Sequence, residues 1–284
     1  MIKSNRFNRN DSTGKIVFIY IVLTIMAIIS VYPLLDIVKI SLRPASGLFS
    51  SDLSLIPKHA TLKNYQVALI DRPYFVWLKN SFVVASTSTL LALIFSVTAG
   101  YAFSRFKFRG RNVSLLSFML TQIFPAPMLL LPTFILLRYF GLLNKYIGGV
   151  VPYIALTVPF SVWLLKGYFD TIPKSFEESA YIDGANMFQV LTKVMLPLAT
   201  PALGVVVLNS FMATWNEFVT ANIVFTDPNL HTLPVALFNM TGALSADWGI
   251  FCAACLVTAA PVIVLYVAMS RFLIGGLTLG GVRE

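Results

Sequence analysis

Residues 16–38 read IVFIYIVLTIMAIISVYPLLDIV and contain one charged side chain, Asp36, close to their end. A helix needs about 20 mostly apolar residues to cross the hydrocarbon layer of a bilayer, which is about 30 Å thick. Because a helix satisfies its own backbone hydrogen bonds in lipid, a run of this kind indicates a transmembrane helix. Six segments of the chain have this character: Ile16–Val38, Ser81–Phe103, Val113–Leu137, Tyr146–Phe169, Pro201–Val224 and Gly249–Leu273.

The composition of the whole chain agrees with this interpretation. Of its 284 residues, 57% are hydrophobic and 12% are charged, whereas charged residues make up about 25% of a typical soluble domain. We therefore predict an all-α membrane protein in which residues 1–284 form one domain of six transmembrane helices. The net charge of +9 does not indicate a nucleic-acid partner. The basic residues gather beside the apolar segments, where they are placed to contact anionic membrane lipid.

The placement of basic residues also predicts the orientation. The N-terminal stretch MIKSNRFNRNDSTGK and the loop SRFKFRGR (residues 104–111) are basic and lie on one side of the predicted arrangement, whereas residues 225–248 on the other side contain no lysine or arginine. Because lysine and arginine concentrate in cytoplasmic loops, both termini and residues 170–200 are expected in the cytoplasm, and residues 225–248 are expected outside. The first apolar segment lacks a small-residue cleavage site and is too long for a signal-peptide core.

The third predicted span contains Pro125, Pro127 and Pro132. Each proline removes a backbone donor and bends or breaks a helix. Two interpretations stay open: the span lines or gates a pore, or it holds static kinks that fit it into the bundle.

The fifth predicted span carries polar residues that are costly in lipid and often face water or a protein interior. We expect Asn209, Trp215, Asn216 and Glu217 to line a translocation path, because polar groups beside aromatic faces suit sugars. The alternative is a hydrogen-bonded cluster that holds neighbouring helices together.

Residues 170–200 connect the fourth and fifth spans and read DTIPKSFEESAYIDGANMFQVLTKVMLPLAT. Ser175 and Glu178 have the spacing of a capping box, and the helix that follows is expected to end at Asp183 and Gly184. Asn186 can cap a second helix, which ends at Pro197. The sequence thus predicts a cytoplasmic helix-turn-helix, which either docks into a groove on a partner or packs as a cap on its own bundle.

Glu178-Ser179-Ala180, followed by Gly184 and by Leu196-Pro197, resembles the EAA loop of ABC importer permease subunits, with serine at a position where alanine is usual. Three more stretches are similar to the carbohydrate branch of that family, the MalG-like permeases of maltose and maltodextrin importers. They are VYPLLDIVKISLRP (residues 31–44), TWNEFVTANIVFTDPNLHTLPVAL (residues 214–237) and RFLIGGLTLGGVRE (residues 271–284).

The resemblance implies a location and a set of partners. The protein would be a multi-pass protein of a bacterial or archaeal cytoplasmic (inner) membrane. It would form a heterodimer with a second permease subunit, bind two ABC ATPase subunits, and receive substrate from an extracellular or periplasmic sugar-binding protein. ATP and Mg²⁺ would be used by the partner ATPase. This chain is expected to bind no cofactor and to be no enzyme, and it contains no G-x-x-x-x-G-K-[ST] stretch.

The resemblance also assigns roles to residues. The cytoplasmic tail, residues 275–284, would reach the ATPase interface, and the external loop, residues 225–248, would meet the binding protein. The residues implied in ATPase coupling are Glu178, Ser179, Ala180, Asp183, Gly184 and Pro197. The residues implied in binding-protein contact are Thr226, Asp227, Asn229, Thr241 and Gly242.

Other classes of function fit the sequence less well. A permease for glycerol-3-phosphate or another small solute is the first alternative, although an external loop with acids and no basic residue favours a neutral sugar. A secondary transporter would favour ionisable groups at the midplane and an internal repeat. A membrane enzyme needs a catalytic constellation, and the two histidines, His59 and His231, lie in external loops without a nucleophile. No metal site is expected, since Cys252 and Cys255 lie within an apolar run.

Overall fold

The computed structural model describes residues 13–44, 57, 59–242 and 247–279, and these ranges contain helices, turns and irregular segments but no strand. The prediction of an all-α chain is confirmed to this extent. The chain divides into two compact units, residues 1–72 with 243–257, and residues 73–242 with 258–284.

The first unit contains α1 (Thr13–Ser41), α2 (Lys63–Gln66), the π-helical η1 (Val67–Asp71) and the start of α13 (Trp248–Leu279). The side chain of Asn64 ties α2 to the end of α1, since its Nδ2 donates to the carbonyl oxygens of Ser41 at 2.9 Å and Arg43 at 2.8 Å. A Cβ on Gly249 would come within 2.5 Å of this amide nitrogen, so α13 begins in close contact with α2.

The second unit is built on α3 (Tyr74–Arg105), α6 (Tyr146–Thr171) and α10 (Thr200–Trp215). Small residues let α3 approach its neighbours closely, as expected for packed membrane helices. A Cβ on Gly100 would lie 3.1 Å from the Cβ of Leu165 on α6. The buried small residues that run along α3 are Ala85, Ser88, Ala92 and Ser96.

The third predicted span, Val113–Leu137, is not one helix. It consists of α4 (Arg111–Thr121) and α5 (Ala126–Tyr139), separated by a break that ends at Pro125, whose backbone is extended. The prediction that prolines interrupt this span is confirmed. The Nε2 of Gln122 in the break donates to the carbonyl oxygen of Leu156, which lies near the middle of α6.

The fifth predicted span, Pro201–Val224, is also broken, and here the prediction of one continuous helix is wrong. The helix α10 ends at Trp215, and a short helix, α11 (Val219–Val224), follows after a gap. Glu217 supplies the physical reason, because its carboxylate accepts hydrogen bonds from the backbone nitrogens of Thr220 and Ala221 and so begins a new helix.

Among the described residues, four helices are long and apolar enough to cross a membrane: Gly14–Ser41, Tyr74–Arg105, Tyr146–Thr171 and Trp248–Ser270. A fifth candidate is a bent pair, Met187–Leu198 with Thr200–Trp215, whose two parts meet at 81°. The count of six spans and the location of the termini stay predictions.

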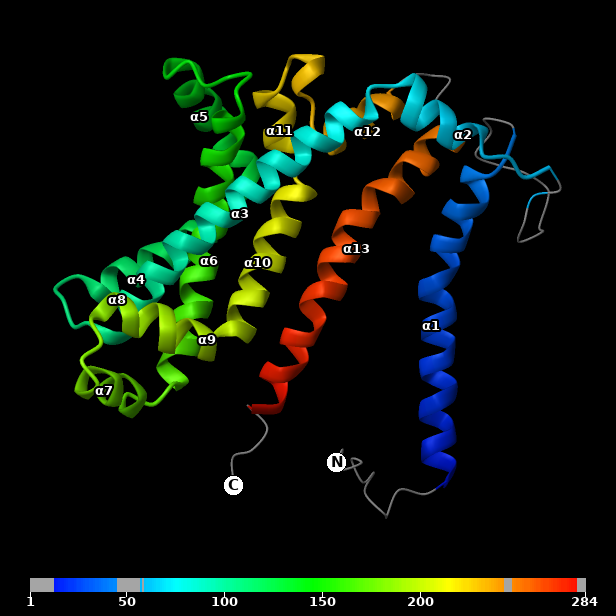
Figure 1. Ribbon diagram of the computed structural model, residues 1–284. Helices are drawn as coiled ribbons and strands as arrows, with labels where there is room; N and C mark the ends of the chain where they lie inside the picture. Colours follow the sequence, from blue (N-terminus) through cyan, green and yellow to red (C-terminus); the bar gives the residue numbers. More distant parts are fainter. Residues whose placement is uncertain (1–12, 45–56, 58, 243–246, 280–284) are drawn as a thin grey trace. The chain divides into compact units, whose positions relative to one another are not determined.

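The remaining elements of the second unit lie at its two ends (Figure 1). At one end, α7 (Ser175–Ile182), α8 (Met187–Gln189), the π-helical η2 (Val190–Met195) and α9 (Leu196–Leu198) lie near the turn between α3 and α4. At the other end are α5, α11, the short 3-10 helix η3 (Pro228–Leu230) and α12 (Leu233–Thr241). We call residues 175–189 the α7–α8 hairpin and residues 225–232 the α11–α12 loop.

Candidate functional site

The α7–α8 hairpin has a sharply defined turn. The helix α7 ends at Ile182, and Gly184 follows with φ of +83°, a left-handed conformation that suits glycine after a helix end. Asn186 and Gln189 form a reciprocal capping box with two hydrogen bonds of 2.9 Å. The predicted stop and the predicted second cap are both confirmed.

The predicted first cap is wrong. Lys174 is the residue before α7 and makes no side-chain cap, and Ser175 is the first residue of the helix. The backbone of Lys174 is already helical, with φ of −63° and ψ of −23°, and its carbonyl oxygen accepts from the backbone nitrogens of Glu177 and Glu178. Ser175 therefore lies inside the helix, where it cannot act as its cap.

The inner side of this region packs into the bundle. Val190, Leu191 and Met195 of η2 are buried in one hydrophobic cluster with α3, α6 and α10. Ala180 of α7, one of the predicted coupling residues, packs against the same cluster. The region is thus anchored in the bundle, as the interpretation as a packed cap requires.

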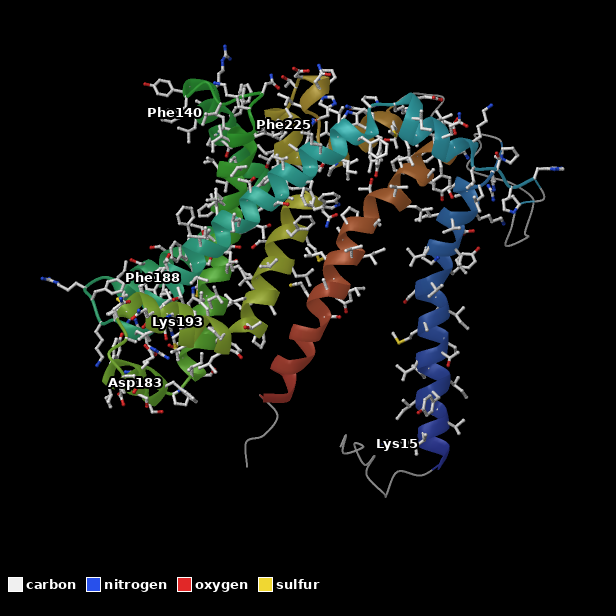
Figure 2. The ribbon with its side chains drawn as sticks, in the orientation of Figure 1. Lys15, Phe140, Asp183, Phe188, Lys193 and Phe225 are labelled. Carbon is white, nitrogen blue, oxygen red and sulfur yellow. The ribbon has the colours of Figure 1, made fainter. Side chains whose placement is uncertain are left out.

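The outer side of the α7–α8 hairpin carries exposed large apolar side chains. Ile182 is 87% exposed and Phe188 is 73% exposed, and Figure 2 shows Phe188 and Asp183 at this end of the unit. Three other predicted coupling residues, Glu178, Ser179 and Gly184, are exposed with Asp183, and Pro197 is exposed on α9. The remaining exposed large apolar residues of this face are Phe176, Tyr181 and Met187.

The acid buried in the hairpin is Glu177, the neighbour of the predicted Glu178. Glu177 is 6% exposed and forms an ion pair with Arg105 at the end of α3. The hydroxyl of Tyr101 donates to the other oxygen, Oε2, at 2.8 Å. Sequence reasoning missed this contact, because Arg105 was interpreted only as part of a basic loop that sets orientation.

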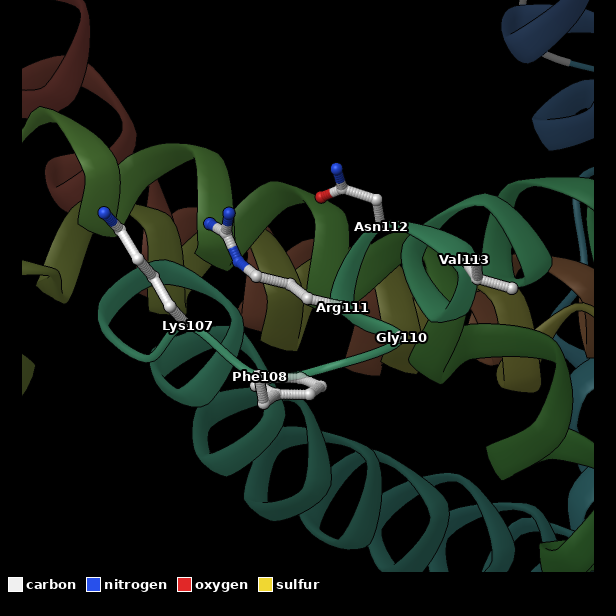
Figure 3. Close-up of a pocket in the computed structure, with 6 residues that line it drawn as sticks. All are labelled: Lys107, Phe108, Gly110, Arg111, Asn112 and Val113. Carbon is white, nitrogen blue, oxygen red and sulfur yellow. The ribbon is translucent and has the colours of Figure 1, made fainter.

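The turn between α3 and α4 is basic and open. It borders a surface hollow of about 340 Å³, shown in Figure 3, which is lined by Lys107, Phe108, Gly110, Arg111, Asn112 and Val113. Arg111 is partly fixed there, since its Nε donates to the carbonyl oxygen of Phe103 at 2.7 Å. Lys107 and Arg109 are exposed, unlike Arg105.

Two of the predicted path residues, Trp215 and Glu217, lie together where α10 ends. Trp215 is buried and stacks on Phe211, with ring centroids 5.3 Å apart. The carboxylate of Glu217 accepts a hydrogen bond of 2.8 Å from the hydroxyl of Tyr153 on α6, in addition to capping α11. Glu217 therefore bonds within the protein to α6 and α11, which agrees with the alternative of a hydrogen-bonded cluster that holds neighbouring helices together.

The other predicted path residues, Asn209 and Asn216, are both exposed. They are seven residues apart, which is about two helical turns, so they lie on one side of α10. The Nδ2 of Asn216 donates to the carbonyl oxygen of Met212 at 3.0 Å. This side of α10 offers amide groups, whereas Trp215 faces inward.

The α11–α12 loop is held to the bundle by Asn144. This residue adopts φ of +55°, and its Oδ1 accepts from the backbone nitrogens of Thr226 at 2.8 Å and Asp227 at 3.0 Å. Its Nδ2 donates to the hydroxyl of Thr226 at 2.8 Å. Two of the predicted binding-protein contacts are thus fixed by one amide.

A second amide, Asn80 on α3, holds the next part of this loop. Its Nδ2 donates to the carbonyl oxygens of Asn229 and His231, both at 2.9 Å, and its Oδ1 accepts from Tyr146 at 2.7 Å. Burial lowers the pKa of His231, although the nearby Asp227 acts in the opposite direction, so this imidazole is neutral at neutral pH.

The remaining predicted contacts, Thr241 and Gly242, come at the end of α12, and residues 243–246 of the predicted external loop lie outside the described residues. The tail, residues 275–284, is described only to Leu279, where its backbone belongs to α13. In the described part of the chain, no three His, Cys, Asp or Glu side chains gather to hold a metal ion.

Comparison with known proteins identifies the family. Residues 92–273 match the family model described as binding-protein-dependent transport system inner membrane component. The galactooligosaccharides transport system permease protein GanQ of Bacillus subtilis (strain 168) is 34% identical over 273 residues, covering 95% of this chain and 96% of the relative. The maltose/maltodextrin transport system permease protein MalG of Vibrio vulnificus (strain YJ016) is 35% identical over 279 residues, covering 89% of this chain and 90% of the relative.

A solved structure agrees with this. A chain from the crystal structure of a bacterial ABC transporter involved in the import of the acidic polysaccharide alginate superposes with a TM-score of 0.80 at 27% identity, covering 92% of this chain and 98% of that chain. The chain therefore belongs to the binding-protein-dependent transport system inner membrane components and is an ABC importer permease subunit.

Proposed function

We propose that this chain is the permease subunit of an ATP-driven importer that moves oligosaccharides of the maltodextrin type from an external binding protein into the cytoplasm. The observation that carries the proposal is the two-sided α7–α8 hairpin. Its inner side packs with α3, α6 and α10 through Ala180 and the adjoining η2, and its outer side exposes apolar residues among acids. A partner that binds the outer side can therefore move the helices packed on the inner side.

The ATPase is the proposed partner for the outer side. Exposed apolar side chains such as Ile182 and Phe188, with the carboxylates of Glu178 and Asp183 beside them, suit a groove that offers apolar pockets and a few basic groups. ATP and Mg²⁺ act in the ATPase subunits. When ATP draws two such subunits together, the hairpin moves with them and shifts the permease between inward-open and outward-open states.

The substrate class rests on the relatives and on charge. The relatives are named for galactooligosaccharides and for maltose and maltodextrin, and the similar structure is involved in alginate import. The described part of the predicted external loop, residues 225–242, contains Asp227 and no lysine or arginine. A neutral oligosaccharide suits this surface better than alginate or glycerol-3-phosphate, because an acidic loop repels an anion.

The side of α10 that carries Asn209 and Asn216 is proposed to face the translocation path. Amide groups can exchange hydrogen bonds with sugar hydroxyls, and the stacked Phe211 and Trp215 behind them stiffen the helix end. The α11–α12 loop is proposed to contact the binding protein through Thr226, Asp227 and Asn229, with Thr241 and Gly242 at its far border. Because the loop is already held by hydrogen bonds, little ordering entropy opposes this contact.

This function places the α7–α8 hairpin and both termini in the cytoplasm and the α11–α12 loop outside, in a bacterial or archaeal cytoplasmic membrane. Counting the two broken segments as spans gives six. A second permease subunit completes the heterodimer and shares the substrate path.

The test is reconstitution with a candidate second permease, ATPase and binding protein from the same organism. Proteoliposomes should take up a labelled maltodextrin only when ATP and the binding protein are both present. Glycerol-3-phosphate and alginate oligosaccharides, offered under the same conditions, should not enter. Uptake driven by an ion gradient without ATP would overturn the proposed class, and uptake of an anion alone would overturn the substrate.

A further inference from the structure

We propose that Arg105 is a positioning residue that ties the α7–α8 hairpin to α3 through Glu177, so that α7 and α3 move as one body during transport. The inference rests on the proposed function, which it deepens. It separates two adjacent acids: Glu177 holds the hairpin to its own subunit, and Glu178 is left to face the partner.

The tie joins parts of the chain that are far apart in sequence. The backbone links α7 only to α6 on one side and to α8 and η2 on the other. Arg105 and Glu177 are separated by 72 residues, and their side chains are each only 8% exposed. This contact, together with the hydrogen bond from Tyr101, joins the carboxylate of Glu177 on α7 directly to α3.

Both oxygens of Glu177 are engaged. The Nε of Arg105 donates to Oε1, and the hydroxyl of Tyr101, one turn earlier on α3, donates to Oε2 at 2.8 Å. Two donors from the same helix hold the carboxylate against both translation and rotation. By contrast, Glu178 is exposed, so the same helix presents one fixed and one accessible carboxylate.

The guanidinium of Arg105 reaches beyond Glu177. Its Nη2 donates to the carbonyl oxygen of Ile172, in the segment that leads from α6 into α7, at 3.0 Å. Its Nη1 donates to the hydroxyl of Ser104 at 3.0 Å, and that hydroxyl donates to Asp170 of α6 at 2.6 Å. Arg105 thus fastens the end of α3, the end of α6 and the start of α7 to one another.

The energetic character of the tie makes it sensitive to single changes. When one partner of a buried ion pair is removed, the other charge stays buried without compensation, which is strongly destabilising. When both partners are replaced together, that penalty disappears. A double-mutant cycle therefore distinguishes action through the pair from two independent effects.

The experiment uses the reconstituted transporter and measures maltodextrin imported per ATP hydrolysed, together with the amount of complex that assembles. Arg105→Gln and Glu177→Gln should each lower the import ratio by about tenfold, within the usual range of coupling between sites, and the double variant should be no worse than either. Arg109→Gln, which changes an exposed cation of the same turn, is the matched control and should behave as wild type.

A milder variant and a second measurement cover the case in which the Gln variants do not assemble. Tyr101→Phe keeps both charges and removes one hydrogen bond, so it should assemble and lower the ratio about twofold to threefold. In the isolated permease, Tyr101→Phe should also speed tryptic cleavage after the exposed Lys174, whereas Tyr139→Phe, at an exposed tyrosine, should not.

The outcomes separate the two proposals. A wild-type complex that imports no sugar with ATP would overturn the proposed function, while the cleavage rates would still decide the tie. Wild-type import ratios in the assembled variants, or cleavage at Lys174 that is unchanged by Tyr101→Phe, would overturn the tie alone. Additive losses in the double variant would also overturn it, because they mean that the two residues act separately.

Discussion

The two ends of the second unit are fastened by different chemistry. The α7–α8 hairpin is held by a buried ion pair, Arg105 with Glu177, and by apolar packing. The α11–α12 loop is held by the neutral amides of Asn144 and Asn80, which bond mainly to backbone groups. A buried ion pair fails when either partner is lost, whereas a set of neutral hydrogen bonds weakens one bond at a time.

The difference matches the tasks proposed for the two ends. A hairpin that transmits the movement of the ATPase needs an attachment with one fixed geometry. The carboxylate of Glu177, which accepts from two donors on α3, provides it. A docking surface needs its backbone kept in one conformation, and amide side chains do this by imitating the peptide group. Changes at the hairpin should therefore affect coupling, and changes at the loop should affect recognition.

The largest effect is expected at the turn of the hairpin. Gly184 has φ of +83°, which proline cannot adopt, so Gly184→Pro should unfold the turn and displace α8. We expect sugar imported per ATP to fall by about 100-fold, near the upper end of coupling between sites, while the protein still inserts into the membrane. Gly184→Asn is the control, because asparagine tolerates the left-handed region. Normal uptake by the proline variant would contradict the coupling role.

A strong effect is expected on the outer side of the hairpin. Phe188 is 73% exposed, and if the ATPase buries it, Phe188→Asp should weaken ATPase binding about 30-fold, the scale of an interface hot spot. Titration of the ATPase onto the permease in nanodiscs measures this. Phe140→Asp is the matched control, since Phe140 is 66% exposed at the opposite end and should leave the affinity unchanged. An equal loss of ATPase affinity in both variants would mean that the ATPase does not bind the α7–α8 hairpin specifically.

A moderate effect is expected at the α11–α12 loop. Asn144→Gly removes the amide side chain and keeps a residue that accepts φ of +55°, so the substitution adds no backbone strain. The backbone amides of Thr226 and Asp227 should exchange with deuterium about tenfold faster, equivalent to about 1.4 kcal/mol. ATPase binding should stay unchanged, whereas affinity for the binding protein should fall. Unchanged exchange would mean that the amide does not hold the loop.

The smallest effect is expected from the hydrogen bond between Tyr153 and Glu217, which lies between the two ends of the unit. Tyr153→Phe removes the hydroxyl that donates to Glu217, which should cost about 1 kcal/mol of stability. Tyr139→Phe, at a tyrosine that is 82% exposed, should leave the thermal midpoint unchanged. A thermal melt of the detergent-solubilised permease compares the two variants. If Tyr153→Phe has the same thermal midpoint as the wild type, the hydrogen bond between Tyr153 and Glu217 does not stabilise the permease.

Local signals predicted much of this architecture. Long apolar runs indicated the membrane helices, and Gly184 and Asn186 indicated the helix end and the second cap, because each acts through neighbouring backbone groups. Pro125, directly before α5, indicated the break in the third span.

The features that the sequence did not reveal depend on distant partners. Nothing local distinguishes Glu177 from Glu178, because the burial of one is decided by Tyr101 and Arg105, more than 70 residues earlier. The end of α10 is marked by neither proline nor glycine, and Glu217 caps α11 while it bonds to Tyr153. No local signal marks Asn144 either, because its contacts are with Thr226 and Asp227, more than 80 residues later in the chain.

The π-helical turns of η2, Val190–Met195, give this segment slack in its length. A π-helix holds more residues per turn than an α-helix, so η2 contains chain that a regular helix of the same height would not need. Removing a single residue here would let η2 close into a regular α-helix, and α9 and α10 would keep nearly the same rotation relative to α8. A one-residue deletion inside α10, a regular α-helix, would instead rotate the part beyond it by about 100°, one residue's share of a helical turn. The permease should therefore tolerate the loss of one residue in η2 far better than the loss of one residue in α10.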